Sequence, residues 1–303
     1  MILRAILQVG LLLLLPPLLP GVVSRVKARF AGREGPPLLQ LYFDLSKLLR
    51  KGTVYSRTTT WVFRAGPVVG LAAIATAGLV VAVAGERALV AFTGDFILFA
   101  YLLGLARFAT ALAALDTGSS FEGMGAAREV TFASLAEPAL FLVLVVLARA
   151  TGTLSLSGML GPGLATAWGH AAPALVLAAF SLFVVALAEN ARIPVDDPNT
   201  HLELTMIHEV MVLDHSGPDL AFILYGASLK LFLFGAIFTR LVLGFRFESL
   251  LAAEAAFVLG LLGFAALVGV VESAMARLRL VRIPQLLVGA SVLSVFAMVL
   301  LLG

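Results

Sequence analysis

The chain contains no cysteine and few charged residues, and both absences restrict its chemistry. Without thiols it forms no disulfide, binds no iron–sulfur cluster through cysteine thiolates and offers no cysteine nucleophile. Only 13% of the 303 residues are Asp, Glu, Lys or Arg, about half the share of an ordinary soluble domain. Any electron carriers that serve redox chemistry are therefore expected in partner proteins, and no cofactor is expected in this chain.

Hydrophobic residues make up 61% of the chain, and the mean hydropathy is +1.05. Apolar runs of about 20 residues recur along the whole length, as spanning helices require. We therefore predict an all-α, polytopic membrane protein that forms a single membrane domain over residues 1–303 and has about eight spans. The expected spans are 2–23, 62–84, 92–115, 130–149, 172–189, 219–240, 250–271 and 284–302. Basic residues follow the first run and no small-residue cleavage site ends it, which favours an uncleaved span over a signal peptide.

The distribution of basic residues orients these spans. Thirteen of the 21 Lys and Arg residues fall in one set of connections, 24–61, 116–129, 190–218 and 272–283, and only five in the opposite set. By the positive-inside rule the first set lies on the cytoplasmic side of the cytoplasmic membrane, and both termini lie on its outer side. The same bias explains the net charge of +3, so no nucleic-acid partner is expected.

Two of the cytoplasmic connections have readable patterns. Pro36-Pro37 followed by leucines at helical spacing predicts an amphipathic helix at the membrane surface, either a basic anchor to anionic lipid or a docking face for a partner. The glycine-rich connection 116–129 lacks the spacing and the lysine of a phosphate-binding loop, so we expect a turn there.

The polar centre of the sequence runs from Ala188 to Asp219. It holds seven of the 18 acidic residues and three of the four histidines. Thr200 and Glu203 form a capping-box pattern that predicts a short helix ending near Asp214. His201, His208 and His215 are seven residues apart and share a face of that helix, but the step of about 10 Å is too long for one metal ion. We expect no metal, and we expect these histidines to face a partner or relay protons.

Several ionisable residues fall inside the predicted spans or at their cytoplasmic ends. They are Arg107, Glu137, Glu189, Lys230, Glu254 and Glu272. Such residues are costly in lipid, so they face the bundle interior or a wet cavity. Together with Glu203, Glu209 and Asp214 of the central loop, Glu137 and Glu189 are candidates for a chain of proton-transfer groups. The alternative is that each acid only pairs with Arg107, Arg192 or Lys230 to hold helices together.

Two motifs resemble a known family. Arg33-Glu-Gly-Pro-Pro-Leu-Leu-Gln40 with Asp44, Lys47 and Arg50 is similar to the first cytoplasmic loop of the respiratory complex I membrane subunit that corresponds to mitochondrial subunit 1. Glu189, Arg192, Pro194, Asp196, Glu203 and Ser216-Gly217 match that family's central loop, and Glu137 falls where the family keeps a fourth-span glutamate. The resemblance implies a coupling role for Glu137, Glu189, Arg192, Asp196, Glu203 and Asp214.

Asn199 and His201 stand where complex I proteins carry further acids. The loop is more similar to the membrane-anchor subunit of membrane-bound [NiFe]-hydrogenases, such as formate hydrogenlyase subunit 4. That likeness implies a non-catalytic membrane subunit whose cytoplasmic loops dock an iron–sulfur small subunit and a [NiFe] large subunit, beside antiporter-like membrane subunits. The metal centres would belong to those partners, with proton or sodium movement coupled to their redox reaction. Whether quinone binds stays open.

Three other functions remain as alternatives. The first is a quinone-site subunit of an NADH:quinone oxidoreductase, and the second is a passive anchor with the same docking loops. The third is a stand-alone ion transporter. No internal repeat is evident, which counts against the transporter.

Overall fold

The computed structural model describes residues 2–83, 87–196, 206–244 and 249–302. Helices and no strands occur in these ranges, which confirms the all-α prediction. Seven helices are long and apolar enough to cross a membrane, and an eighth span results if the bent pair α1–α2 is counted as one. The chain is thus a multi-pass membrane protein with the predicted number of spans.

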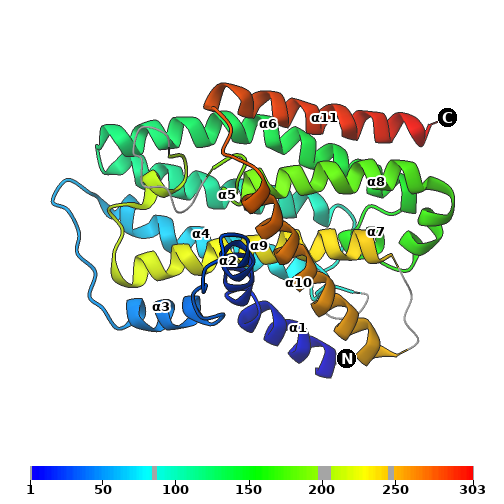
Figure 1. Cartoon of the computed structure of the whole chain (residues 1–303), viewed down its shortest axis with the longest axis horizontal. Coiled ribbons are helices and arrows are strands. Elements are labelled where there is room, and N and C mark those ends of the chain that lie inside the picture. Colours follow the sequence, from blue (N-terminus) through cyan, green and yellow to red (C-terminus); the bar gives the residue numbers. More distant parts are fainter. Residues whose placement is uncertain (1, 84–86, 197–205, 245–248, 303) are drawn as a thin grey trace.

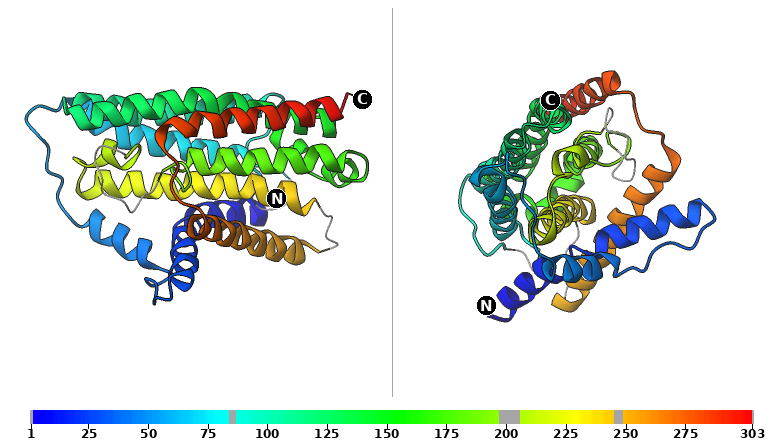
Figure 2. Two further views of the ribbon diagram at one scale, coloured as in Figure 1. Left: turned by 45° about the horizontal axis from the view of Figure 1, so that its top comes forward. Right: turned by 90° about the vertical axis from the view of Figure 1, so that its left-hand side faces the viewer.

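Most of the long helices run side by side in one bundle (Figure 1). They are α4 (Trp61–Val80), α5 (Asp95–Asp116), α6 (Ser120–Thr151), α8 (Gly163–Glu189), α9 (Gly217–Leu243) and α11 (Ile283–Leu300). The remaining long helix, α10 (Leu250–Ala274), runs obliquely to them (Figure 1). Seen end-on, α8 and α9 lie among the others (Figure 2). They are also the most buried spans, at 67% and 61%. Residues at the ends of α8 and along α9 are therefore placed to meet side chains from several neighbours.

The first span is broken. Pro16-Pro17 separates α1 (Ile2–Leu14) from α2 (Leu18–Phe30), and the two helices are bent by 46°. Because a proline supplies no N–H and clashes with the preceding turn, a continuous helix cannot pass this point. The predicted end at residue 23 is seven residues short of the end of α2. The amphipathic helix forms as α3 (Gln40–Leu49), beginning a few residues after Pro36-Pro37.

The glycine-rich connection 116–129 is not the expected turn. Most of it forms the first turns of α6, which begins at Ser120. Gly125 explains why glycine is useful inside this helix: a Cβ there would lie 2.9 Å from the carbonyl oxygen of Ile207. The segment before α9 therefore packs directly on the α6 backbone at Gly125.

The expected helix ending near Asp214 is also not seen in the described part of the central loop. Residues 206–214 contain the single 3₁₀ turn η1 (Glu209–Val212), so His208 and His215 do not share a helix face. His201, Glu203 and the capping-box threonine Thr200 lie outside the described residues. The remaining short elements are α7 (Leu156–Met159) and η2 (Leu280–Arg282).

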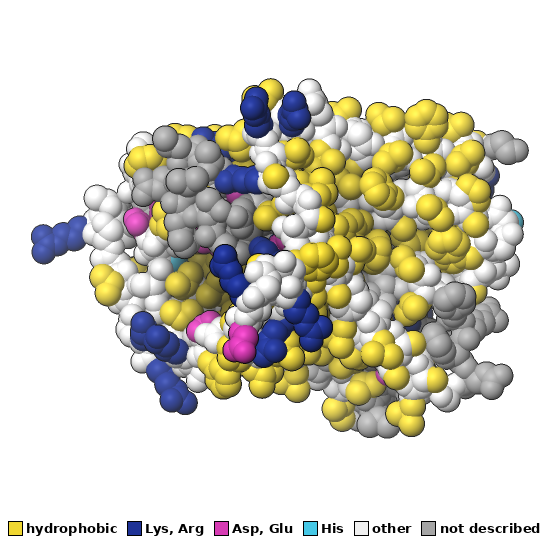
Figure 3. All heavy atoms as spheres, viewed as in Figure 1, with side chains coloured by type: hydrophobic (Ala, Val, Ile, Leu, Met, Phe, Trp, Pro, Cys, Tyr) yellow, Lys and Arg dark blue, Asp and Glu magenta, His cyan; other side chains and the backbone are white. Residues whose placement is uncertain are grey.

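Charged side chains are unevenly distributed over the bundle, and aromatic rings pack in its interior. In Figure 3 the Lys, Arg, Asp and Glu side chains gather over the left and middle of the visible face, while the right part is mostly hydrophobic. Inside, rings of Phe183, Phe238 and Phe264 pack together at centroid distances of 5.3–5.9 Å, and Phe99 meets Phe234 at 6.4 Å. Both termini lie toward the end that also holds α7, as an even number of spans requires (Figure 1).

Candidate functional site

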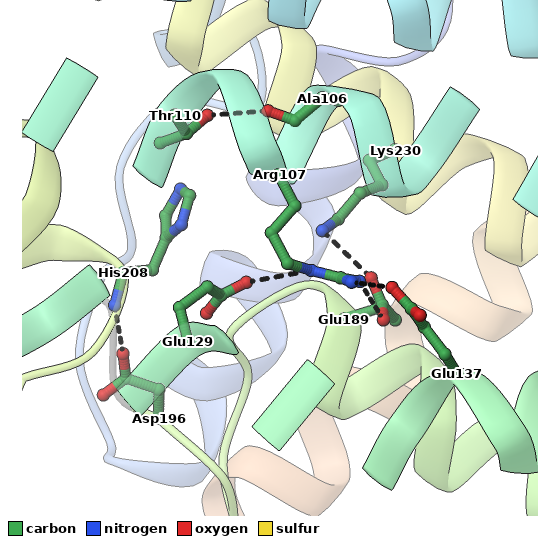
Figure 4. Close-up of polar contacts among 9 residues, drawn as sticks. All are labelled: Ala106, Arg107, Thr110, Glu129, Glu137, Glu189, Asp196, His208 and Lys230. Carbon is green, nitrogen blue, oxygen red and sulfur yellow. Dashed lines mark hydrogen bonds and ion pairs between the residues drawn. The ribbon is translucent and has the colours of Figure 1, made fainter. Parts of the chain in front are cut away.

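Arg107 of α5 is the centre of the main polar cluster in the bundle. Its side chain is 9% exposed and meets three carboxylates, Glu129 and Glu137 of α6 and Glu189 at the end of α8 (Figure 4). The guanidinium Nη2 donates to Glu189 Oε1 at 2.5 Å, and Nε lies 3.6 Å from Glu129 Oε1. Nη1 donates to Glu137. One arginine therefore links α5, α6 and α8.

Lys230 of α9 adds a second positive charge. Its Nζ donates to the other oxygen of Glu189 at 3.3 Å. We refer to Arg107, Glu129, Glu137, Glu189 and Lys230 as the Arg107 cluster. It contains three carboxylates and two cations, so full ionisation leaves one uncompensated negative charge. An unpaired charge away from water is costly. A proton or another monovalent cation bound in the cluster restores neutrality.

Asp196 organises a second polar contact next to this cluster. Its side chain is 1% exposed, and Oδ1 lies 2.8 Å from Nη2 of Arg277. Oδ2 accepts from the backbone N–H groups of Ile207 and His208, both at 3.1 Å. Charge-assisted bonds of this kind hold the start of the 206–215 segment against the residues that follow α8.

His208 is neutral at physiological pH. Burial, reinforced by the positive charge of Lys230, lowers the pKa of His208 to about 4, while Asp196 acts in the opposite direction. Its ring therefore has one nitrogen free to accept a hydrogen bond and one that donates.

A third contact ties the periphery of the bundle to the central loop. Glu272 of α10 lies 2.7 Å from Nζ of Lys27 in α2 and 3.4 Å from Nη1 of Arg192. The glutamate side chain is fully buried. Because both neighbours are basic, this group matches the helix-pairing alternative rather than a proton-transfer group.

A cavity of about 720 Å³, counting the space at its mouth, opens beside the Arg107 cluster. Arg107, Glu129, Glu189, His208 and Lys230 line its polar part. Pro67, Ile74, Phe222 and Ile223 line its apolar part. A neighbouring cavity of about 620 Å³ shares Asn190, Ala191, His208 and Ala227 with it. His208 thus stands at the wall between two hollow regions.

The structure brings together only part of the predicted proton-transfer set. Arg107, Glu137, Glu189 and Lys230 meet in one cluster, whereas Arg192 and Asp196 belong to the separate contacts described above. Glu209 begins η1 and lines the neighbouring cavity, and Asp214 is exposed at the far end of the same segment.

The predicted docking residues divide in the same way. Arg33, Lys47 and Arg50 are exposed, and Gln40 donates to Asp44 within α3 at 3.0 Å. His215 is 5% exposed and stacks on Phe63 with the ring centroids 4.0 Å apart. Burial also lowers the pKa of His215.

Glu129 is the member of the cluster that the sequence reasoning missed. It was assigned to the edge of a loop, although Glu122, Glu129 and Glu137 are spaced by seven and eight residues, as acids on one helix face are. That spacing was the signal available in the sequence.

Known proteins resemble this chain over most of its length. A family model described as NADH dehydrogenase matches residues 3–303. Hydrogenase-4 component C of Escherichia coli (strain K12) is 34% identical over 248 residues, which are 81% of this chain and 76% of that protein. Formate hydrogenlyase subunit 4 of the same organism is 30% identical over 291 residues, 94% of either chain.

The fold also has a solved counterpart. A chain of the membrane-bound sulfane sulfur reductase, an archaeal respiratory membrane complex, matches with a TM-score of 0.82 and 19% identity over 99% of both chains. At that identity the likeness concerns the fold.

Proposed function

The chain belongs to the NADH dehydrogenase family, among the complex-I-related membrane subunits, and from this membership we propose that it couples a partner's electron transfer to ion movement. In this proposal it is an integral subunit of a hydrogenase-type assembly in the cytoplasmic membrane. The observation that carries the proposal is the charge count of the Arg107 cluster, three carboxylates against two cations. A buried group with one negative charge in excess binds and releases a proton when a nearby charge changes.

The redox partner would dock on the end of the bundle that holds α3 and η1. The names of the two curated relatives, a component of hydrogenase-4 and a subunit of formate hydrogenlyase, support a multi-subunit setting. We propose that an iron–sulfur small subunit and a [NiFe] large subunit lie there and carry all the metal centres. Exposed Arg33, Lys47 and Arg50 would contribute to that face. Co-purification of the chain in mild detergent, with metal analysis of the bound proteins, tests this part.

Glu137 supports a second partner within the membrane. It lies near the middle of the 32-residue helix α6, and its side chain is 46% exposed. Next to it, exposed Pro138 has no N–H, so the carbonyl of Ser134 loses its helical partner. A charge at mid-bilayer costs about 2.5–3.5 kcal/mol on insertion scales. We therefore propose that a helix of an antiporter-like subunit covers this face and receives the ion.

The experiment is to measure ion movement against redox turnover in membrane vesicles of the intact complex with Glu137→Gln and with Glu203→Gln. The proposal expects turnover to continue while ion movement per turnover falls. Glu272→Gln is the matched control, because it removes a buried carboxylate that has two basic partners outside the Arg107 cluster. Unchanged ion movement in the first two variants would remove them from the path. Repeating the assay with and without sodium distinguishes H⁺ from Na⁺.

The cavity beside the Arg107 cluster favours one alternative, a quinone-site subunit. It has an apolar part and a polar part beside His208, as a site for a lipophilic molecule with a polar head requires. Gly70 lines it, and a Cβ there would meet only ordinary contacts at 3.7 Å or more, so Gly70→Leu would fill the space. Quinone in the purified complex, lost in Gly70→Leu, would support this alternative; absence of quinone from both would exclude it.

A further inference from the structure

Glu122 is a buried carboxyl that the proposed ion path does not use. It lies in the first turn of α6, is 2% exposed, and neither of its carboxyl oxygens has a hydrogen-bond partner among the described residues. The hydroxyl of Thr117 and the backbone N–H of Asp214 lie near the carboxyl and favour its charged form, but burial outweighs their effect. The Thr117 hydroxyl donates instead to the carbonyl of Ala114 at 2.7 Å. A negative charge on Glu122 would therefore be poorly compensated.

The charged groups around Glu122 also disfavour ionisation. Asp214, from the segment before α9, is the carboxylate that acts on it. The next residue, His215, has its pKa lowered by burial and is neutral, and Asp219 of α9 lies beyond it. On α6 itself, the guanidinium of Arg128 donates to Met206 O at 3.0 Å and to Met124 Sδ at 2.7 Å.

Burial of Glu122 favours the protonated carboxyl over the carboxylate. The N-terminus of α6 favours a negative charge, but that effect is small beside the cost of burying an unpaired carboxylate next to a second one. A metal ion is not an alternative occupant, because no three His, Asp or Glu side chains in the described parts of the chain converge to hold one. The ligand that fits is a proton.

The neighbouring segment depends on the same surface of α6. The start of the segment 206–215 is held by Asp196, which accepts hydrogen bonds from the N–H groups of Ile207 and His208. Near the other end of the segment, Asp214 lies beside Glu122. Between these points Met211 and Val212 pack with Ala111, Ala114 and Ala126 of α5 and α6. At Gly125, one turn after Glu122, the segment packs so closely on α6 that a Cβ would lie 2.9 Å from the carbonyl oxygen of Ile207.

We propose that Glu122 is a proton-binding site whose proton keeps residues 206–215 packed on α5 and α6. Loss of the proton leaves a negative charge on the buried carboxyl of Glu122, beside the exposed carboxylate of Asp214, and the segment separates from α6. Because His208 in this segment lines both cavities, release of the proton also opens the wall between them. The inference goes beyond the coupling function and does not require the Arg107 cluster to carry ions.

The absence of cysteine makes a direct test possible. Met211 belongs to the segment and is 1% exposed, so a cysteine at this position (Met211→Cys) reacts with a maleimide only when the segment opens. The reaction is carried out in membranes holding the whole complex and is read by mass spectrometry of this chain. An exposed reference outside the proposed docking face, Thr93→Cys, corrects for the pH dependence of the thiol itself. Measurements between pH 7 and 9.5 lie above the range in which His208 or His215 takes up a proton.

The corrected labelling rate of Met211→Cys is expected to rise with pH, by up to about tenfold per pH unit, because opening releases one proton. In Glu122→Gln, which stays neutral, the rate stays low and independent of pH. Glu34→Gln, an exposed acid, retains the rise. The same rise in Glu122→Gln, or a flat profile with Glu122 present, would overturn the proposal. Hydrogen exchange of residues 206–215 in the unsubstituted chain at pH 7 and pH 9.5 gives a second measurement, in which equal protection at both values also overturns it.

Discussion

Glu189 uses both of its carboxylate oxygens, one for Arg107 of α5 at 2.5 Å and the other for Lys230 of α9 at 3.3 Å. The residue closes α8, the most buried span of the bundle, and its side chain is 3% exposed. A single acid thus joins three helices at the point where the central loop begins. Both the stability of this region and the proposed coupling depend on that arrangement.

Removing the arginine should destabilise the chain strongly. Arg107→Met leaves three carboxylates against Lys230 alone, and breaking a buried pair in this way costs about 3–5 kcal/mol. Thermal unfolding of the detergent-solubilised complex measures the loss. Adding Glu189→Gln to Arg107→Met should recover part of it, because one unpaired charge is removed. An Arg107→Met protein that unfolds at the original temperature would contradict the assigned ion pairs.

Two glycines of α6 should respond to alanine in opposite ways. A Cβ at Gly125 would lie 2.9 Å from the Ile207 carbonyl oxygen, so Gly125→Ala must displace the 206–215 segment. At Gly123 the nearest atom is Leu115 Cδ2 at 3.9 Å, so Gly123→Ala should be neutral or stabilise the helix by about 0.5–1 kcal/mol. Hydrogen exchange of residues 206–215 compares the two. Equal protection in both variants would show that the segment does not pack at Gly125 as described.

Acid should loosen the same segment through His208. Its folded-state pKa of about 4 is below the ordinary value near 6.5, so the unfolded or opened chain binds the proton more tightly. Stability from the neutral ring is therefore complete above about pH 6.5 and is lost as the pH falls toward 4. Hydrogen exchange of residues 206–212 should accelerate from pH 6.5 to pH 5 after correction for intrinsic exchange. The His208→Gln variant should show no such change; if it does, another group is responsible.

The docking face should be sensitive to charge reversal. Lys47 and Arg50 are exposed on α3 and at its end, away from the Arg107 cluster. The double change Lys47→Glu with Arg50→Glu should reduce the peripheral subunits recovered with the chain in mild detergent, while the chain itself remains in the membrane. Arg149→Glu is a control at the opposite end of α6. Equal recovery of the partners in both variants would exclude α3 as a docking element.

The span count was predictable because it depends on hydrophobic runs, which every part of the chain displays on its own. The break at Pro16-Pro17 was missed since the apolar run continues across it. The helical start of α6 was missed for a different reason: glycines weaken an isolated helix, and packing against η1 compensates for that loss. Assigning 116–129 to a turn then removed Glu129 from the list of buried acids.

The partners of the ionisable residues were beyond the reach of the sequence. Arg107 and Glu189 are 82 positions apart, and Arg192 and Glu272 are 80 apart. Glu189 was a candidate for the proton-transfer chain and Glu272 was listed only as an ionisable residue at the end of a span; of the two, Glu189 joins the Arg107 cluster. The packing of the helices decides which acidic residue pairs with which basic residue, and this packing cannot be read from a single sequence.

The central claim is that the Arg107 cluster exchanges a proton during turnover. Infrared difference spectra of the intact complex, recorded between its oxidised and reduced forms, observe the carboxyl groups themselves. The account predicts a protonated-carboxyl C=O band that changes with the redox state, is lost or shifted in Glu129→Gln, Glu137→Gln or Glu189→Gln, and persists in Glu272→Gln. A carboxyl band that is unaltered by all three cluster substitutions, or the absence of any redox-linked carboxyl band, would contradict it.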